Sequence, residues 1–263
     1  PELVTYELES TRLIIMSGDD GVAERFINAP AILKGGMGPA LADLDNDGFG
    51  EIIIVTNNRD LVAYRHTGAL YFENPGVVGY DAGYEFAVVG VADFDQDGLP
   101  EIYVGNQIFD NTGQLIAQGG QNNAQGVHPE LKGSNAFNAV VAVDAVPTSA
   151  CPDCDGLELV AGNQIYTVDL ANGNMTVYRE VNGFSDGYTS VADFNKDGML
   201  DAIVQGMDNG RKVVYGWDLN TGNVLGSFYF TTSLSNGASR VNIGDLDGDG
   251  SLDFCFSAHP NFY

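Results

Sequence analysis

The sequence is organised around a nine-residue stretch that first reads Asp43-Leu44-Asp45-Asn46-Asp47-Gly48-Phe49-Gly50-Glu51. The stretch returns with its first residue at Asp93, Asp193 and Asp245. In each copy an acidic or amide residue stands at positions 1, 3, 5 and 9, and glycine stands at position 6. Alternate side chains of a tight loop can point to one centre, and the glycine lets the backbone turn so that the carbonyl of position 7 joins them. The frame therefore predicts a loop that surrounds a cation with oxygen atoms.

An all-oxygen cage is the environment that Ca2+ prefers, since this ion takes about 6–8 oxygen ligands in a flexible geometry. We expect about four Ca2+ ions, one in each loop. An Asp/Gly-rich turn that binds nothing is the alternative, but such a turn needs no acid at position 9. The predicted ligands are Asp43, Asp45, Asp47, Phe49, Glu51, Asp93, Asp95, Asp97, Leu99, Glu101, Asp193, Asn195, Asp197, Met199, Asp201, Asp245, Asp247, Asp249, Ser251 and Asp253.

The residues around the loops are typical of β-strands rather than of EF-hand helices. Position 12, which is a bidentate Glu in an EF-hand, is apolar in all four copies: Ile54, Val104, Val204 and Phe256. Short runs of β-branched and aromatic residues stand on both sides of each loop, which predicts a hairpin with the loop at its tip.

The spacing of the copies predicts the architecture. Their first positions are residues 43, 93, 193 and 245, so they lie 50, 100 and 52 residues apart. A degenerate copy is expected at Asp144, where positions 3 and 5 are Val146 and Thr148 and the cage is lost. The following strand resumes at Glu158, the counterpart of Glu101. We expect no metal in this unit.

Each period divides into four predicted strands, and four-stranded periods of about 40–50 residues are typical of β-propeller blades. The predicted fold is all-β, a fragment of a larger propeller. Blades are expected to start near residues 36, 86, 137, 187 and 239, with residues 1–30 as the remainder of a preceding blade. The loops and the period resemble the FG-GAP/VCBS repeats of integrin α-subunit propellers and of many secreted bacterial proteins.

This resemblance implies a secreted or cell-surface recognition or adhesion module, stabilised by Ca2+ and belonging to a larger polypeptide. In the related integrin propellers the ligand binds opposite the metal loops. The long connectors of that face carry Tyr80, Tyr84, Phe137 and Phe184, which are candidates for contact with a protein or glycan ligand. Packing of these rings between blades is the alternative.

Two further functions remain open. Certain rhamnogalacturonan lyases resemble this chain in their loops, but a lyase would have basic residues clustered near a calcium. The 11 Lys and Arg residues are scattered, and no catalytic residue stands out, so we expect no enzyme. A structural spacer in a large surface protein is the third possibility.

The charge of the chain supports metal binding. The formal net charge is −25, and the four loops contain 15 of the 36 acidic residues. Nucleic acid would require a basic patch, so it is not an expected partner. No apolar run approaches the length of about 20 residues that a membrane-spanning helix needs.

The cysteines at Cys151 and Cys154 form a CxxC pair within the degenerate loop. Half a zinc site and a redox pair are alternatives, but the sequence favours a disulfide that stiffens this loop. A disulfide is typical of an oxidising, extracellular compartment.

Overall fold

The computed structural model describes residues 2–34, 38–79, 87–131, 137–151, 155–231, 240–258 and 261–262. Within these residues the chain is all-β and its sheets are antiparallel, as predicted. No described helix is long and apolar enough to cross a membrane.

Most strands belong to four-stranded sheets, each formed by consecutive strands. These are β4 (Ala40–Ala42), β5 (Glu51–Val55), β6 (Leu61–Tyr64) and β7 (Leu70–Asn74); β8 (Gly90–Ala92), β9 (Glu101–Val104), β10 (Gln107–Phe109) and β11 (Leu115–Gln118); β12 (Val140–Val143), β13 (Glu158–Ala161), β14 (Gln164–Asp169) and β15 (Asn174–Glu180); β16 (Tyr188–Ala192), β17 (Asp201–Asp208), β18 (Arg211–Asp218) and β19 (Val224–Phe230). A 3-10 turn, η1 (Leu170–Asn172), lies between β14 and β15. The expected four strands per period are therefore confirmed.

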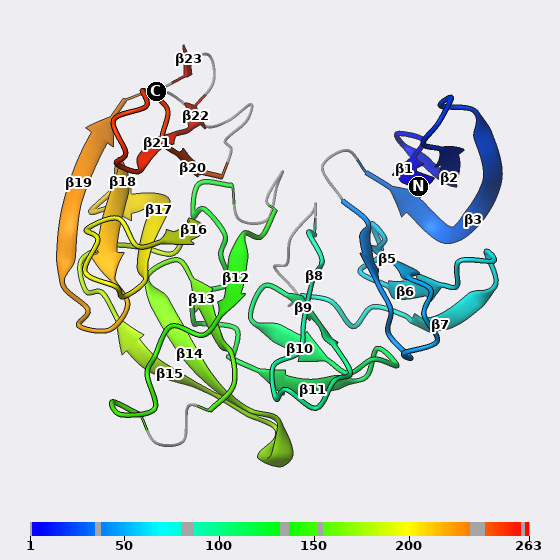
Figure 1. Cartoon of the computed structure of the whole chain (residues 1–263), viewed down its shortest axis with the longest axis horizontal. Helices are drawn as coiled ribbons and strands as arrows, with labels where there is room; N and C mark the ends of the chain where they lie inside the picture. The colour runs from blue at the N-terminus through cyan, green and yellow to red at the C-terminus, as the bar shows by residue number, and fades with distance from the viewer. Residues whose placement is uncertain are drawn as a thin grey trace.

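Smaller sheets complete the described chain. β1 (Glu2–Tyr6), β2 (Ser10–Ser17) and β3 (Ala23–Leu33) form a three-stranded sheet. β20 (Asn242–Gly244) pairs with β21 (Asp253–Cys255), and β22 (Ser257–Ala258) pairs with β23 (Asn261–Phe262). The sheets follow one another along an arc in the manner of propeller blades, with β8, β12 and β16 towards its inside and β11, β15 and β19 towards its outside (Figure 1). The arc stays open between the sheet β1–β3 and strands β20–β21 in the described residues.

The second strand of a sheet is buried on both of its faces, which explains its unbroken apolar run. Every residue of β5 is buried. Ile53 and Val55 pack in a cluster with residues of β9, whereas Ile52 and Ile54 pack in another with residues of β2 and β3. Because successive side chains of a strand point to opposite faces, one strand supplies two inter-sheet cores.

Polar side chains fix the long connectors between sheets. The Asp186 carboxylate accepts hydrogen bonds from four backbone N–H groups, those of Gln125, Gly126, Val127 and Gly187. This carboxylate therefore ties the connector before β12 to the start of β16.

His128 is fully buried on the same connector. Its Nδ1 accepts a hydrogen bond from the Glu130 N–H at 3.3 Å, and its Nε2 lies 3.3 Å from the Gly206 carbonyl. This pairing requires a neutral ring, and burial lowers the pKa of His128 to about 4.

Candidate metal loops

The four intact loops share one backbone conformation, built around the carboxylate of position 1. In the first loop, Asp43 accepts hydrogen bonds from the N–H groups of Asp47 at 3.1 Å and Gly48 at 2.9 Å. Equivalent bonds to the glycine of position 6 recur in the other three loops, at 2.9 to 3.0 Å. The glycine has a positive φ in every loop, +90° at Gly48 for example, a conformation that costs glycine little.

The predicted ligands converge in three loops. Oxygen atoms of positions 1, 3 and 9 lie within 4.8 Å of one another in the first, second and fourth loops. This separation is about twice a Ca–O distance, so one ion can contact all three groups. The third loop has Asn195 at position 3, and its Nδ2 donates a 2.9 Å hydrogen bond to Asp197.

The carboxylate of position 9 is the most deeply buried ligand candidate. One oxygen of Glu51 accepts a 2.9 Å hydrogen bond from the Leu44 N–H. The other oxygen, Oε1, is buried without a hydrogen-bond partner among the described residues, as is Oδ1 of Asp45; Oδ1 of Asp201 is equally unpartnered in the third loop. A buried acceptor without a partner is costly, and a cation would satisfy these three atoms. The donor set therefore fits a hard cation.

Electrostatics agree with this geometry. Burial raises the pKa of Glu51, Glu101 and Asp201, that of Glu101 to about 7, and repulsion from neighbouring loop carboxylates adds to the effect. A cation at the centre of the loop would offset that repulsion and favour the charged form.

In the degenerate loop the carboxylate of position 9 remains in place without the cage. Glu158 accepts hydrogen bonds from the N–H groups of Ala145 at 2.8 Å and Val146 at 3.0 Å. Val146, which replaces the ligand of position 3, is buried in the core between the third and fourth four-stranded sheets. Position 9 thus ties the start of this loop to β13, a role that the sequence frame did not reveal.

Side chains at position 4 connect each loop to the next one. Asn46 donates to the carbonyl of Gly98 at 2.9 Å, and Lys196 donates to that of Gly250 at 2.7 Å. Gln96 reaches the carbonyl of Asp155 at 3.4 Å. The acceptor is position 6 of the following loop for Asn46 and Lys196; for Gln96 it is Asp155, which stands three residues before Glu158, as position 6 stands three before position 9. Sequence reasoning missed these contacts. Position 4 of the loop has a positive φ, a conformation that suits Asn46 in the first loop and Gly248 in the fourth.

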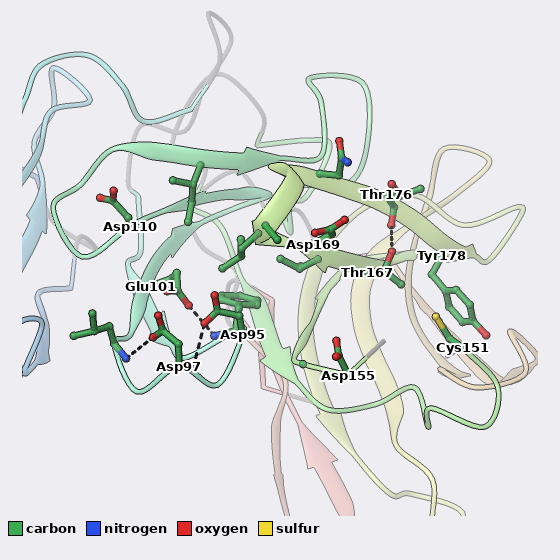
Figure 2. A pocket seen from close by; sticks show the side chains of 18 of the residues that line it. Asp95, Asp97, Glu101, Asp110, Cys151, Asp155, Thr167, Asp169, Thr176 and Tyr178 are labelled. Atoms are coloured by element: carbon green, nitrogen blue, oxygen red, sulfur yellow. Dashed lines mark hydrogen bonds between the residues drawn. The ribbon is translucent and has the colours of Figure 1, made fainter. Parts of the chain in front are cut away.

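A pocket of about 1000 Å3 lies beside the second loop, between the second and third four-stranded sheets. Its lining includes Thr167 and Thr176, which are joined by a hydrogen bond, and the ring of Tyr178 (Figure 2). Its six carboxylates are those of Asp95, Asp97, Glu101, Asp110, Asp155 and Asp169. None of the described lining residues is basic.

Two of the aromatic candidates for ligand contact take part in internal packing. Phe137 stacks on buried Tyr188 with ring centroids 4.0 Å apart, and Phe184 stacks on buried Tyr215 at 4.4 Å. Both phenylalanines are half-buried. Their stacking agrees with the alternative prediction, in which these rings pack between blades.

Three predicted residues lie outside the described part of the chain, namely Tyr80, Tyr84 and Cys154. The pairing of Cys154 with Cys151 therefore stays a prediction. Cys255, on β21, is a free thiol.

The comparison with known families agrees with the loops and the sheets. The profile described as FG-GAP-like repeat matches residues 43–104 and 193–256. The chain contains FG-GAP-like repeats. No curated protein matches the chain by sequence.

Solved structures with similar folds are numerous. The Vibrio cholerae (V. cholerae) biofilm matrix protein Bap1 is 18% identical with a TM-score of 0.58, over 87% of this chain and 35% of Bap1. The chain therefore spans about a third of the length of Bap1, and this likeness concerns the fold alone. BamB from Moraxella catarrhalis is 14% identical over 90% of this chain and 70% of its own, with a TM-score of 0.46. The Bacillus licheniformis rhamnogalacturonan lyase PL11 is 16% identical over 94% of this chain and 47% of its own, with a TM-score of 0.34.

Proposed function

We propose that this chain is a Ca2+-stabilised recognition module of an extracellular or cell-surface protein, and that it binds a protein or glycan ligand without catalysis. The observation that supports the metal assignment is a group of loop oxygens, those of Asp45, Glu51 and Asp201, that are buried and have no hydrogen-bond partner in the described part of the chain. Side chains of positions 1, 3, 5 and 9 and the carbonyl of position 7 would hold the ion. The bound ion would neutralise the carboxylates of the loop that joins the first and second strands of a blade.

The stabilising role is tested by thermal unfolding of the whole chain in millimolar Ca2+, in Mg2+ and in chelator. An ion that binds only the folded state adds about 2.7 kcal/mol per site at 100-fold excess over its Kd. We expect a higher Tm in Ca2+ than in either control, because Mg2+ demands a stricter octahedral geometry. An equal Tm in Ca2+ and in chelator would refute the structural role.

The pocket beside the second loop provides a candidate surface for the ligand, in addition to the face opposite the loops. Three of its six carboxylates, those of Asp95, Asp97 and Glu101, would be neutralised by the proposed ion, and the other three, those of Asp110, Asp155 and Asp169, favour a neutral or basic group over an acidic one. Binding of the chain to arrayed glycans and matrix proteins tests recognition, and the variant Thr176→Arg tests the pocket. Loss of binding in this variant would support the pocket as the ligand site, whereas retained binding would support the face opposite the loops. Failure to bind any arrayed ligand would favour the role of a structural spacer.

A further inference from the structure

The first loop differs from the others because a basic side chain of the same sheet enters it. Arg65, directly after β6, places its Nη1 2.8 Å from Oδ2 of Asp45 and 3.5 Å from Oδ2 of Asp47. These two carboxylates are positions 3 and 5 of the loop. Among the described residues, no Lys or Arg forms an ion pair with a carboxylate of the other three loops.

Neighbouring contacts hold Arg65 at this position. Its guanidinium lies over the ring of Tyr71 at 4.6 Å from the centroid. The next residue, His66, stacks on Phe49, which is position 7 of the same loop, with centroids 4.2 Å apart. The hairpin turn after β6 is therefore attached to the metal loop by two contacts from adjacent residues.

The corresponding residue in the next sheet has the opposite charge. Arg65 stands two residues before the turn Thr67-Gly68, and Asp110 stands two residues before the turn Thr112-Gly113. Asp110 uses its Oδ1 to accept hydrogen bonds within its own turn, from Thr112 and Gln114. A cation paired with the carboxylates of positions 3 and 5 is thus a feature of the first loop, whereas Lys196, the cation beside the fourth loop, donates to the backbone carbonyl of Gly250.

We infer that Arg65 competes with the metal ion for Asp45 and Asp47, so that the first loop has a lower Ca2+ affinity than the second and fourth loops. This inference rests on the Ca2+ binding proposed above. To bind an ion, the loop must release the Arg65 contact or accept a positive charge next to a divalent one, and both oppose binding. Loops two and four have the same number of side-chain carboxylates, and among the described residues no Lys or Arg forms an ion pair with them. Lys196 reaches loop four at the backbone carbonyl of Gly250, so it does not occupy a carboxylate that the ion needs.

The affinity difference gives the module a graded response. Loops two and four would stay filled over a range of Ca2+ concentrations in which the first loop fills and empties. Filling would free Arg65 and the turn that contains His66. The carbonyl of His66 accepts a hydrogen bond from Arg25 of β3, so the change occurs at the contact with the sheet β1–β3.

A site-resolved titration tests this inference. In protein labelled with 15N-glycine, the amides of Gly48, Gly98 and Gly250 report the first, second and fourth loops, because each donates to the carboxylate of position 1. The expected midpoint for Gly48 is at about tenfold higher Ca2+ than those of Gly98 and Gly250. Arg65→Gln should lower the Gly48 midpoint about tenfold and leave the other two unchanged.

Two variants serve as controls. Arg65→Lys keeps the charge but not the planar fork, and should keep most of the high midpoint. Arg211→Gln removes an arginine that pairs with Asp208 at 3.1 Å, outside the metal loops, and should leave all three midpoints unchanged. Equal midpoints in the wild-type chain, or a Gly48 midpoint that Arg65→Gln does not move, would overturn the inference. If none of the glycine amides responds to millimolar Ca2+, the proposed metal binding itself is wrong.

Discussion

Replacement of Glu158 by Ala should destabilise the chain equally in Ca2+ and in chelator. The change removes the acceptor of two buried N–H groups, those of Ala145 and Val146. Hydrogen bonds to a charged group contribute about 1.5–3 kcal/mol each. Burial raises the pKa of Glu158, so part of this gain is offset by the cost of burying the carboxylate. We therefore expect a net loss of about 3 kcal/mol, or a fall in Tm of about 6–12 °C at about 2–4 °C per kcal/mol.

The matched control is Glu101→Ala, the same substitution at position 9 of an intact loop. Glu101 accepts one backbone hydrogen bond, from the Phe94 N–H at 2.8 Å, and is a predicted metal ligand. The loss of stability in Glu101→Ala should be larger in Ca2+ than in chelator. In Ca2+ the substitution removes a ligand of the ion, whereas in chelator it also relieves repulsion among the loop carboxylates. Circular dichroism melts of both variants in the two buffers measure the difference. The reasoning would be refuted if the loss in Glu158→Ala depended on Ca2+, or if the loss in Glu101→Ala did not.

Three further predictions concern other parts of the chain. Asp95→Ala should lower the Tm measured in Ca2+ and reduce the further effect of chelator; an unchanged Tm in Ca2+ would argue against Asp95 as a ligand. The pKa of His128 is about 4 in the folded chain, below the ordinary value of 6.5, so the unfolded chain binds the extra proton first and stability should fall as pH decreases from about 6.5 to about 4. Urea unfolding at several pH values should give this fall, up to about 3 kcal/mol, and His128→Gln should flatten it; an equally steep fall in the variant would exclude His128 as the cause. Cys151 and Cys154 should resist alkylation without reductant in the secreted protein, and mass spectrometry that finds both alkylated would exclude the disulfide.

The repeated features of this chain were determined by the sequence alone. The frame from Asp43 to Glu51 predicted both a tight loop and the strands on either side of it, and the spacing of about 50 residues predicted four-stranded units. These features depend on residues close together in the chain: a glycine that accepts positive φ, acids at alternate positions, and β-branched runs. The loss of the cage at Val146 was visible for the same reason.

The contacts between neighbouring units were decided by the tertiary structure. Three such contacts join residues of different strands or sheets: Arg65 enters the first loop, Lys196 donates a hydrogen bond to the next loop, and Phe137 stacks on Tyr188. Such contacts depend on how each sheet is rotated against the next and on which rotamer a long side chain adopts, and the spacing of residues encodes neither. The sequence thus predicted which residues form each acidic loop, whereas the packing of sheets set what surrounds each loop and therefore how the loops differ.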